Sequence, residues 1–497
     1  MMSVLKGTGI TFTKSQSGKK MLEKRTKLQI NVLEKRIFLY FCRWENGQIM
    51  INRKIDSFLE KYYTSTNKAL LITGARQTGK TYSIRHFGRT HFENMVEINF
   101  IEMSDAGSVL STAKNSRDLL LRISSLTTQP LIEGKTLIFF DEVQECPEIV
   151  TAIKFLVDEG NYRYIMSGSL LGVELNDLRS EPVGYMDVKE MFPLDMEEFF
   201  MAVGLSQMVM DELRDAWENK HPVDEFVHTK LMELFRLYLI VGGMPAAVQK
   251  YLDSNNLQEV LAEQQAILRL YKRDIAKYDK KNKLYLEEVF DLIPSELNAK
   301  NKRFVLKNLN ENAKFSHFEN SFIWLKEADV ALPVYNVEEP TIPLKLSRSR
   351  NLFKLFQNDV GLLASQYADG IQLRLLTDAK SINFGSVYEN AIAQELSAHG
   401  FDLYYFNSKK QGELDFVIEK NGTVVPIEVK SGKDYHRHNA LSNVMSNQSY
   451  QIPEAIVFSN ENLLHSDKVM YLPVYMAMFI ETQTPVDITY KVDLSGL

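Results

Sequence analysis

Cysteine is scarce in this chain: Cys42 and Cys146 are its two cysteines, and they lie far apart in 497 residues. Disulfide frameworks and cysteine-based zinc sites need several cysteines at short spacings, so neither is predicted. Long hydrophobic runs are also missing, because no apolar stretch reaches the roughly 18 residues that a membrane-spanning helix needs. We therefore expect a protein of the reducing cytoplasm without a membrane partner.

A general excess of positive charge is absent too. The net charge is −6, and 45% of the residues are apolar and 25% charged, as in soluble globular proteins. This balance excludes a uniformly basic coat for nucleic acid but leaves room for a local basic patch. The length exceeds one ordinary domain and predicts about three.

The first 49 residues are more basic than the rest, with ten lysines and arginines against three glutamates. Such a tail could contact nucleic acid or act as a transit peptide, although the glutamates weaken the second explanation. Alternatively, translation begins at Met50, because residues 50–63 read as a start followed by an amphipathic helix. The sequence leaves these explanations open.

A glycine-bracketed turn lies between an apolar strand and a helix in LLITGARQTGKTYSI, residues 71–85. Gly74, Gly79, Lys80 and Thr81 satisfy the phosphate-binding pattern G-x-x-x-x-G-K-[ST]. Glycines let the backbone N–H groups point at phosphate oxygens, and the helix N-terminus adds a positive dipole. We expect Lys80 to reach the β- and γ-phosphates of ATP and Thr81 to ligate Mg²⁺. The other loop residues of this nucleotide site are Ala75, Arg76, Gln77 and Thr78.

An acidic pair follows a second apolar strand. In TLIFFDEVQ, residues 136–144, the apolar run ends in Asp141 and Glu142, and ligands bind where buried parallel strands end. We expect Asp141 to hold Mg²⁺ and Glu142 to be the catalytic group that polarises the attacking water. A solvated acidic turn is the alternative.

Strands and helices alternate between residues 69 and 169, which predicts an α/β fold with a parallel sheet. The segment YRYIMSGS, residues 162–169, reads as a strand and carries Ser167 near its end. Strand ends meet at one edge of a parallel sheet, so Ser167 is expected beside the γ-phosphate. Its hydroxyl could report the nucleotide state or cap the next segment.

Further motifs complete a pattern that resembles prokaryotic AAA-type ATPases whose C-terminal half is a domain of unknown function numbered 4143. The likeness covers Met50 to about Tyr471. Besides the two ATPase motifs, it is carried by IMSGSLLGV, FPLDMEEFF, VGGMPAAV, YKRDIAKY, GSVYENAIAQEL, GELDFVI and PIEVKSG. The resemblance implies a P-loop AAA-type ATPase core, a helical and winged-helix-like middle, and a C-terminal α/β domain similar to restriction-endonuclease-like nucleases.

The resemblance and the composition together divide the chain into five segments. We expect a basic extension at 1–49, an AAA-type ATPase domain at 50–204, a helical lid at 205–283, a winged-helix-like domain at 284–370 and a restriction-endonuclease-like domain at 380–480. Residues 272–283 carry six basic residues against two acidic ones, which is typical of a solvated face or of a nucleic-acid contact.

One position departs from the family pattern. The family usually has Gly-Arg before the strand that leads to Pro-Leu, and this chain has Tyr185 in place of that arginine. An arginine that stabilises charge accelerates phosphoryl transfer by orders of magnitude. The substitution therefore puts the rate of hydrolysis in doubt, unless Arg179, Arg236 or Arg273 takes that part.

A second set of acidic residues lies near the C-terminus. Asn421-Gly422 is a strong hairpin signal between two strands, and Glu428 and Lys430, two residues apart, project from one strand face toward Asp415. Asp415 and Glu428 could bind a divalent cation while Lys430 activates water, with Glu389 from an upstream helix in support. A solvated Glu-x-Lys pair on an ordinary strand is the alternative.

The leading hypothesis is an ATPase that couples nucleotide binding and hydrolysis to a nuclease-like domain acting on DNA or RNA, with Asp415, Glu428 and Lys430 catalytic. The alternative is an ATP-dependent regulatory switch or assembly protein whose C-terminal domain binds partners without catalysis. ATP and Mg²⁺ are the expected cofactors in both. A homo-oligomer is also considered.

Overall fold

The computed structural model describes residues 44–45, 48–49, 51–169, 182, 184–278, 283–299, 302–309, 315–367, 370–377 and 384–482. Residues 1–51 and 52–497 are two separate compact units. In the first unit, the two-residue strands β1 (Trp44–Glu45) and β2 (Gln48–Ile49) pair antiparallel. Most of the basic extension expected at 1–49 lies outside the described residues.

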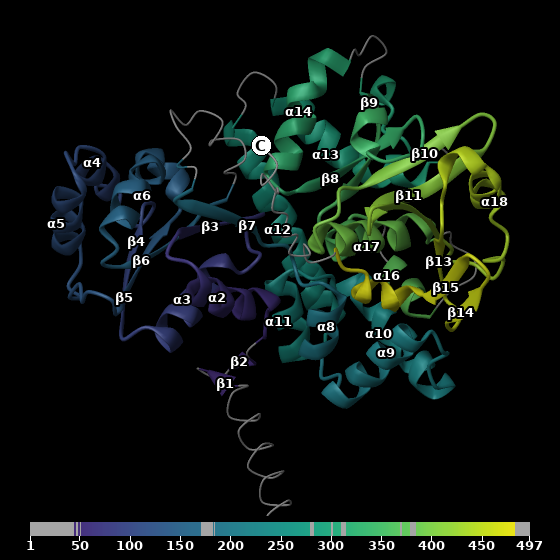
Figure 1. Cartoon of the computed structure of the whole chain (residues 1–497), viewed down its shortest axis with the longest axis horizontal. Helices are drawn as coiled ribbons and strands as arrows, with labels where there is room; N and C mark the ends of the chain where they lie inside the picture. Colours follow the sequence, from purple (N-terminus) through teal and green to yellow (C-terminus); the bar gives the residue numbers. More distant parts are fainter. Residues whose placement is uncertain are drawn as a thin grey trace, which may run out of the picture. The chain divides into compact units, whose positions relative to one another are not determined.

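The first large sheet has five parallel strands in the order β4–β5–β6–β3–β7 (Figure 1). Its strands are β3 (Ala69–Thr73), β4 (Asn94–Asn99), β5 (Thr136–Asp141), β6 (Arg163–Ser167) and β7 (Met186–Glu190). The α/β fold with a parallel sheet is therefore confirmed. Because β3 is flanked by β6 and β7, its C-terminal end lies among the ends of neighbouring strands.

Helices cover both faces of this sheet (Figure 1). Leu70 and Ile72 pack in one apolar cluster with α2 (Lys54–Ser65) and α3 (Lys80–His91). The alternate residues of β3, Ala69 and Leu71, pack in a second cluster on the other face. The helices on that face are α4 (Ala106–Ser111), α5 (Ser116–Leu126) and α6 (Pro147–Glu159), with the short η1 (Val143–Glu145) before α6. Burial on both faces explains why the strands read as continuous apolar runs.

A run of helices follows the sheet. They are α8 (Met196–Ala202), α9 (Gln207–Asn219), α10 (Glu225–Val241), α11 (Pro245–Ser254), α12 (Leu257–Tyr278), α13 (Lys283–Asn298) and α14 (Phe315–Glu327). The expectation of helices from residue 205 agrees with this run.

No described helix is by itself long and apolar enough to cross a membrane, although α10 and α11, bent by 120°, pass that test as a pair by length and composition.

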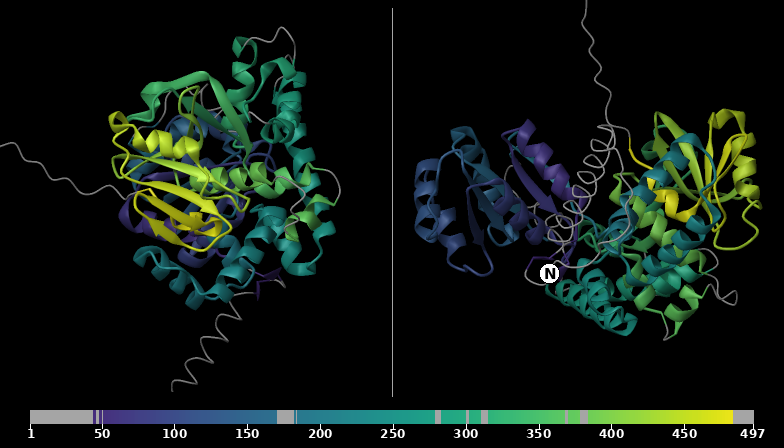
Figure 2. Two further views of the ribbon diagram at one scale, coloured as in Figure 1. Left: turned by 90° about the vertical axis from the view of Figure 1, so that its right-hand side faces the viewer. Right: turned by 90° about the horizontal axis from the view of Figure 1, so that it is seen from below.

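The second large sheet is mixed and has eight strands in the order β14–β15–β13–β12–β11–β10–β8–β9 (Figures 1 and 2). Its strands are β8 (Ala331–Val337), β9 (Arg348–Gln357), β10 (Tyr404–Ser408), β11 (Gly412–Lys420), β12 (Thr423–Val429), β13 (Ala455–Ser459), β14 (Leu464–Ser466) and β15 (Val469–Pro473). The strand-like segments expected in a wing thus extend the C-terminal sheet, since β8 pairs in parallel with β10.

Two helices pack on opposite faces of the mixed sheet. The long α17 (Gly385–Ala398) is buried from Ser386 to Leu396 and contacts β8, β9 and β12. On the other face, α18 (Asn439–Ser446) contributes Leu441 and Val444 to an apolar cluster with the strands. The remaining short helices are η3 (Leu306–Asn308), η4 (Leu344–Ser347), α15 (Val360–Ser365), α16 (Ile371–Leu376), η5 (Gln448–Tyr450) and η6 (Val474–Phe479).

Candidate functional site

The glycine-bracketed turn forms a tight loop between β3 and α3. Gly74 and Gly79 have φ angles of 130° and 97°, which glycine adopts without strain. A Cβ on Gly74 would lie 2.3 Å from the carbonyl oxygen of Met191, so a side chain does not fit there. Lys80 begins α3 and donates from Nζ to the carbonyl oxygens of Gly74 and Ala75, each at 2.8 Å. The loop therefore encloses its lysine at the helix N-terminus.

Three strand ends meet this loop around Asp141, the last residue of β5. The Thr81 hydroxyl donates to the Asp141 carboxylate at 3.2 Å, and the Ser167 hydroxyl at the end of β6 donates to the same group. Asn99, which ends β4, donates its amide to Asp141 Oδ2 at 3.0 Å. The structure thus brings together the predicted residues Thr81, Asp141 and Ser167. A hydroxyl and a carboxylate at this separation are oxygen donors of the kind that Mg²⁺ takes, so the residues fit the ion.

Glu142 lies at the turn after β5 in the left-handed conformation, with φ of 57°. Its backbone N–H donates to Asp141 Oδ1 at 3.1 Å, and Gln144 Nε2 donates to its carboxylate at 2.6 Å. Left-handed backbone is uncommon for a residue other than glycine and costs energy unless its surroundings hold it. These contacts place a carboxylate beside the Asp141–Thr81 pair.

Burial sets the charge state of the site. It lowers the pKa of Lys80 to about 8, and the nearby carboxylates of Glu142, Asp329 and Asp141 oppose that shift. Burial also raises the pKa of Asp141, against the hydrogen bond from Ser167. Both shifts favour the neutral form, because the site removes water without supplying a full counter-charge to either group.

Some contacts of this site were not expected from the sequence. Arg53, just before α2, donates to the carbonyl oxygens of Thr78 and Phe192 at 2.9 and 2.7 Å and forms an ion pair with Glu198 at 3.1 Å. No motif marks Arg53. Asn99 could have been found, because it ends a predicted strand and strand ends meet at one edge.

Arg76 connects the loop to α12. Its guanidinium forms an ion pair with Asp274 at 3.0 Å and donates to the Ser169 hydroxyl at 3.2 Å. The Tyr271 hydroxyl donates to the Arg76 carbonyl oxygen at 3.2 Å. The motif YKRDIAKY, quoted for the resemblance, thus supplies two residues that hold the loop.

Tyr185 lies at the opposite end of the sheet from the loop. In the register of β3 and β7, Ala69 pairs with Met186 and Thr73 with Glu190, so Tyr185 precedes the amino-terminal end of β7. An arginine there would be about 17 Å from the loop along the strand, given about 3.3 Å per residue. Its replacement by tyrosine therefore takes no side chain away from this chain's own loop. Arg179 lies outside the described residues.

The C-terminal residues predicted to act together do lie together. Asn421 and Gly422 have positive φ angles and Lys420 pairs with Thr423, which confirms the hairpin between β11 and β12. Asp415 accepts a hydrogen bond from the Val429 N–H at 2.9 Å. Lys430 Nζ lies 2.6 Å from Glu428 Oε2. Burial, followed by the charge of Asp415, raises the pKa of Glu428 to about 8 against the effect of Lys430.

Two lysines that the sequence did not bring to attention complete this cluster. Lys302 pairs with the buried Glu389 of α17, and the fully buried Lys354 of β9 lies 2.8 Å from Glu413. The carboxylates of Glu389 and Asp415 both act to raise the pKa of each of these lysines, against the effect of burial. The acidic residues are thus offset by lysines from residues 302–354 as well as by Lys430. Within the described parts of the chain, no three carboxylate or histidine ligands of this cluster are close enough together to hold an ion.

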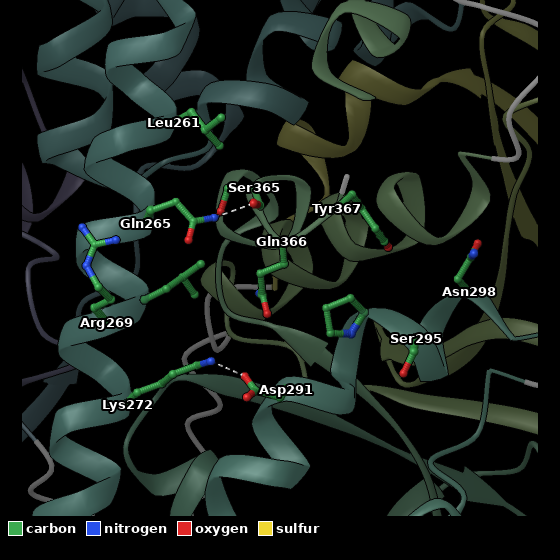
Figure 3. A pocket seen from close by; sticks show the side chains of 12 residues that line it. Leu261, Gln265, Arg269, Lys272, Asp291, Ser295, Asn298, Ser365, Gln366 and Tyr367 are labelled. Carbon is green, nitrogen blue, oxygen red and sulfur yellow. Dashed lines mark hydrogen bonds and ion pairs between the residues drawn. The ribbon is translucent and has the colours of Figure 1, made fainter. Parts of the chain in front are cut away.

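The basic segment after residue 271 is partly engaged in ion pairs. Lys272 lies 2.6 Å from Asp291 of α13, beside a cavity of about 750 Å³ between α12 and α13 (Figure 3). Gln265 closes part of that cavity by donating to the Ser365 carbonyl oxygen at 2.6 Å. Arg269, Arg273 and Lys277 are exposed on the same helix. Residues 279–282 of the segment lie outside the described residues.

Comparison with known families gives three matches along the chain. A model of an AAA domain matches residues 66–200, and models of two domains of unknown function, DUF8612 and DUF4143, match residues 232–373 and 384–476. The comparison with curated proteins found no match. The third match begins just before α17, so β8 and β9 precede it although they belong to the same sheet.

The solved structures that match this chain are distant. A Walker-type ATPase of Pyrococcus abyssi is 15% identical, with 64% of this chain and 96% of that chain covered and a TM-score of 0.39. The Orc1 protein of Aeropyrum pernix in complex with DNA is 10% identical, with 67% and 94% covered and a TM-score of 0.29. RuvB of Thermotoga maritima is 12% identical, with 61% and 92% covered and a TM-score of 0.28. By its family matches, the chain is an AAA-domain protein with a C-terminal domain of unknown function 4143.

Proposed function

We propose that this chain is an ATP-hydrolysing switch, in which ATP and Mg²⁺ bind at the loop of residues 74–81 and the nucleotide state acts on the C-terminal domain. The observation that carries the proposal is the convergence of Lys80, Thr81 and Asp141 at the carboxyl ends of parallel strands. Ligands bind at this edge in open α/β sheets. The AAA domain match over residues 66–200 supports the same activity.

Each residue of the loop has a defined part in this proposal. The N–H groups of the loop and the N-terminus of α3 would bind phosphate oxygens. Lys80 would neutralise the β- and γ-phosphates. Thr81 and Asp141 would hold Mg²⁺, which supplies positive charge to the phosphate oxygens when it is bound. Glu142 would accept a proton from the attacking water, and Ser167 would keep Asp141 in place.

Lys80→Ala tests this assignment. The variant should lose ATP binding and turnover, because the other cationic side chain of the loop, Arg76, is already paired with Asp274. Binding of a fluorescent ATP analogue and phosphate release would be measured with purified protein, using Lys61→Ala on the exposed face of α2 as the control. Unchanged affinity and turnover in Lys80→Ala would remove the basis of the proposal.

The nucleotide state has two contact routes to the rest of the chain. Arg76 links the loop to Asp274 of α12, and Arg53 links the Thr78 carbonyl to Glu198 of α8. Both routes use charged groups with limited exposure to water, where an ion pair is sensitive to small movements of either partner. A movement of the loop when phosphate binds would therefore change the ion pairs that the loop and Arg53 make with α12 and α8.

A second candidate function is a nuclease in the C-terminal domain. Asp415 of β11 lies close to Glu428 of β12 and to Lys430, which directly follows β12, and this favours it. Lys302 and Lys354 weigh against it, because they offset the carboxylates that would otherwise need a cation. The restriction-endonuclease-like character of this domain is part of this second candidate.

Cleavage assays on the full chain separate the two functions. Duplex and single-stranded DNA and RNA would be incubated with protein, Mg²⁺ or Mn²⁺, and each nucleotide state, in parallel with Asp415→Asn. Cleavage that disappears in Asp415→Asn while ATP turnover survives would establish the nuclease. If nothing is cut, DNA-stimulated ATP turnover would still identify nucleic acid as the partner of the switch.

Partners and location belong to the same proposal. DNA or RNA is the proposed macromolecular partner, and the exposed Arg269, Arg273 and Lys277 of α12 would contribute positive charge to such a contact. A homo-oligomer is also proposed, in which a second copy would bring a residue to the loop. Within one chain, position 185 is too far from the loop for an arginine there to act on it. The scarcity of cysteine supports a cytoplasmic location.

A further inference from the structure

A second group of ionisable side chains lies away from both sites described above. Asp195, just before α8, meets Glu395 of α17 and His399, the residue that directly follows α17, and their ligand atoms lie within 4.8 Å of one another. The three side chains are 94–100% buried. Glu395 and His399 are four residues apart, but Asp195 lies about 200 residues before them, so sequence spacing gives no sign that Asp195 joins the pair.

Each of the three side chains is held by a backbone hydrogen bond through one atom only. Asp195 Oδ1 accepts from the Glu198 N–H at 2.9 Å, and Glu395 Oε2 accepts from the Met196 N–H at 3.0 Å. His399 Nδ1 lies 2.7 Å from the Ile480 carbonyl oxygen. A carbonyl oxygen only accepts, so Nδ1 carries the hydrogen and Nε2 is the ring atom that faces the carboxylates.

The remaining three atoms face one another at distances within ion-pair range but too long for hydrogen bonds. His399 Nε2 is 3.6 Å from Asp195 Oδ2 and 3.6 Å from Glu395 Oε1. Among the described residues, Nε2 and Oε1 have no hydrogen-bond partner. A hydrogen bond at 3.6 Å is too long, whereas ligands about 2.1 Å from a tetrahedral metal ion are about 3.4 Å apart.

We infer that Asp195, Glu395 and His399 form a binding site for a divalent transition metal, with Zn²⁺ the best match. Imidazole with carboxylate oxygens suits Zn²⁺, and backbone partners that orient the ligands are a feature of metal sites. A cavity of about 250 Å³ reaches Asp195 and His399, which gives the ion an entry path and room for a water ligand.

Lys54 is the internal competitor of the ion. Its ammonium lies 2.7 Å from Asp195 Oδ2, the oxygen that the metal would take, and also 2.7 Å from Glu197 Oε2. When the metal takes Asp195 Oδ2, the Lys54 ammonium can therefore remain paired with Glu197. Asp195 lies in the part of the chain matched by the AAA domain, whereas Glu395 and His399 lie in the C-terminal match. The bound ion would therefore cross-link these two parts of the chain.

Metal binding to the full chain without nucleotide tests the inference. Zn²⁺ would be titrated against a chelating indicator, followed by measurement of metal content after dialysis. Wild-type protein should bind one Zn²⁺ per chain at this site, and His399→Gln should weaken binding by more than about 100-fold. His465→Gln should bind Zn²⁺ as the wild type does, because His465 is exposed on β14, and Asp415→Asn is measured beside it to detect any Zn²⁺ held by the other acidic cluster.

Lys54→Met separates a metal site from a cluster of ion pairs. Removing the competing ammonium should strengthen Zn²⁺ binding, with the fold checked by circular dichroism and thermal melting. If folded Lys54→Met and wild-type protein both bind no Zn²⁺ or Mn²⁺, the group is an ion-pair cluster and the inference is wrong. It is equally wrong if Asp415→Asn, and not His399→Gln, loses the metal.

Discussion

At the scale of single residues, the loop site depends on groups whose ordinary charge is opposed by burial. Lys80 and Asp141 are both buried. Burial lowers the pKa of Lys80 and raises the pKa of Asp141, and both shifts favour the neutral form of the side chain. A phosphate chain with Mg²⁺ would reverse both tendencies, because it brings negative charge to Lys80 and positive charge to Asp141. Nucleotide binding is therefore expected to change the protonation of the site.

The affinity for ATP should depend on pH through Lys80. Its pKa in the structure is about 8, and bound phosphates would raise it, so the complex keeps a proton that the free protein loses above pH 8. The dissociation constant should be constant below that pH and should rise by about tenfold per pH unit above it. Calorimetry between pH 7.5 and 9.5 in two buffers would show the proton uptake.

Lys80→Arg is the control for this pH dependence, because a guanidinium stays charged over the whole range. Whatever its absolute affinity, its dissociation constant should not change between pH 7.5 and 9.5. A flat profile for the wild-type protein would mean that Lys80 is already fully charged before ATP binds.

Glu142→Gln should separate binding from hydrolysis. The amide keeps the shape of the side chain and its contact with Gln144, but it cannot accept a proton from water. Turnover should fall by about 10²–10⁴-fold while the affinity for ATP stays within about threefold. Single-turnover phosphate release measures the first quantity and equilibrium binding the second.

Glu145→Gln is the matched control for Glu142, because Glu145 lies exposed on the same turn. Its turnover should equal that of the wild-type protein. Loss of ATP binding in Glu142→Gln would show instead that the Glu142 carboxylate has a structural part.

At the scale of elements, the junction between α10 and α11 ties the end of the ATPase part to the mixed sheet. The Gly243 N–H donates to Asp359 Oδ2 at 2.6 Å, and its carbonyl oxygen accepts from the Leu194 N–H at 2.7 Å. A Cβ on Gly243 would lie 2.0 Å from the Leu194 carbonyl oxygen. The motif VGGMPAAV is thus a close backbone crossing as well as a helix break.

Gly243→Ala should destabilise the chain, because the added methyl group forces Leu194 and its neighbours apart. Overpacking of this kind costs about 1–3 kcal/mol or somewhat more. Thermal and urea unfolding would measure the loss, with Gly432→Ala as the control, since a Cβ on Gly432 has no heavy atom within 4 Å. Equal stability of the two variants would contradict the close crossing.

The elements that the sequence could predict are those with a local signal. Residues 71–85 carry their own turn and helix start, and Asn421-Gly422 marks its hairpin, so both were predicted. Pairing between distant segments has no such signal. The parallel pairing of β8 with β10 joins residues about 70 apart, and it brings β9, with Lys354, to the acidic cluster. The charges expected for that cluster from the sequence therefore did not include Lys302 and Lys354.

At the scale of the whole molecule, sheet pairing and hydrogen bonds of the C-terminal domain extend across its expected boundary between residues 370 and 380. Its first helix is hydrogen-bonded to the segment before that boundary: Asn390 accepts from the Gln357 N–H at 2.8 Å, and Gln394 accepts from the Val360 N–H at 2.8 Å. Gln394 also donates to the Tyr238 hydroxyl of α10 at 2.9 Å. A signal that moves α10 or α15 would therefore reach α17, which carries Glu389 and Glu395 and is followed directly by His399.

A fragment of residues 380–482 should for this reason fail to fold cooperatively. It lacks β8 and β9, so the edge of β10 is unpaired and prone to association, and the buried amides of Asn390 and Gln394 lose their partners. A fragment of residues 283–482 restores both strands and should show more soluble protein and a sharper thermal transition. Circular dichroism melting of the two fragments measures the difference. Cooperative melting of the shorter fragment would show that β8 and β9 are dispensable, and then the C-terminal activities could be tested apart from the ATPase.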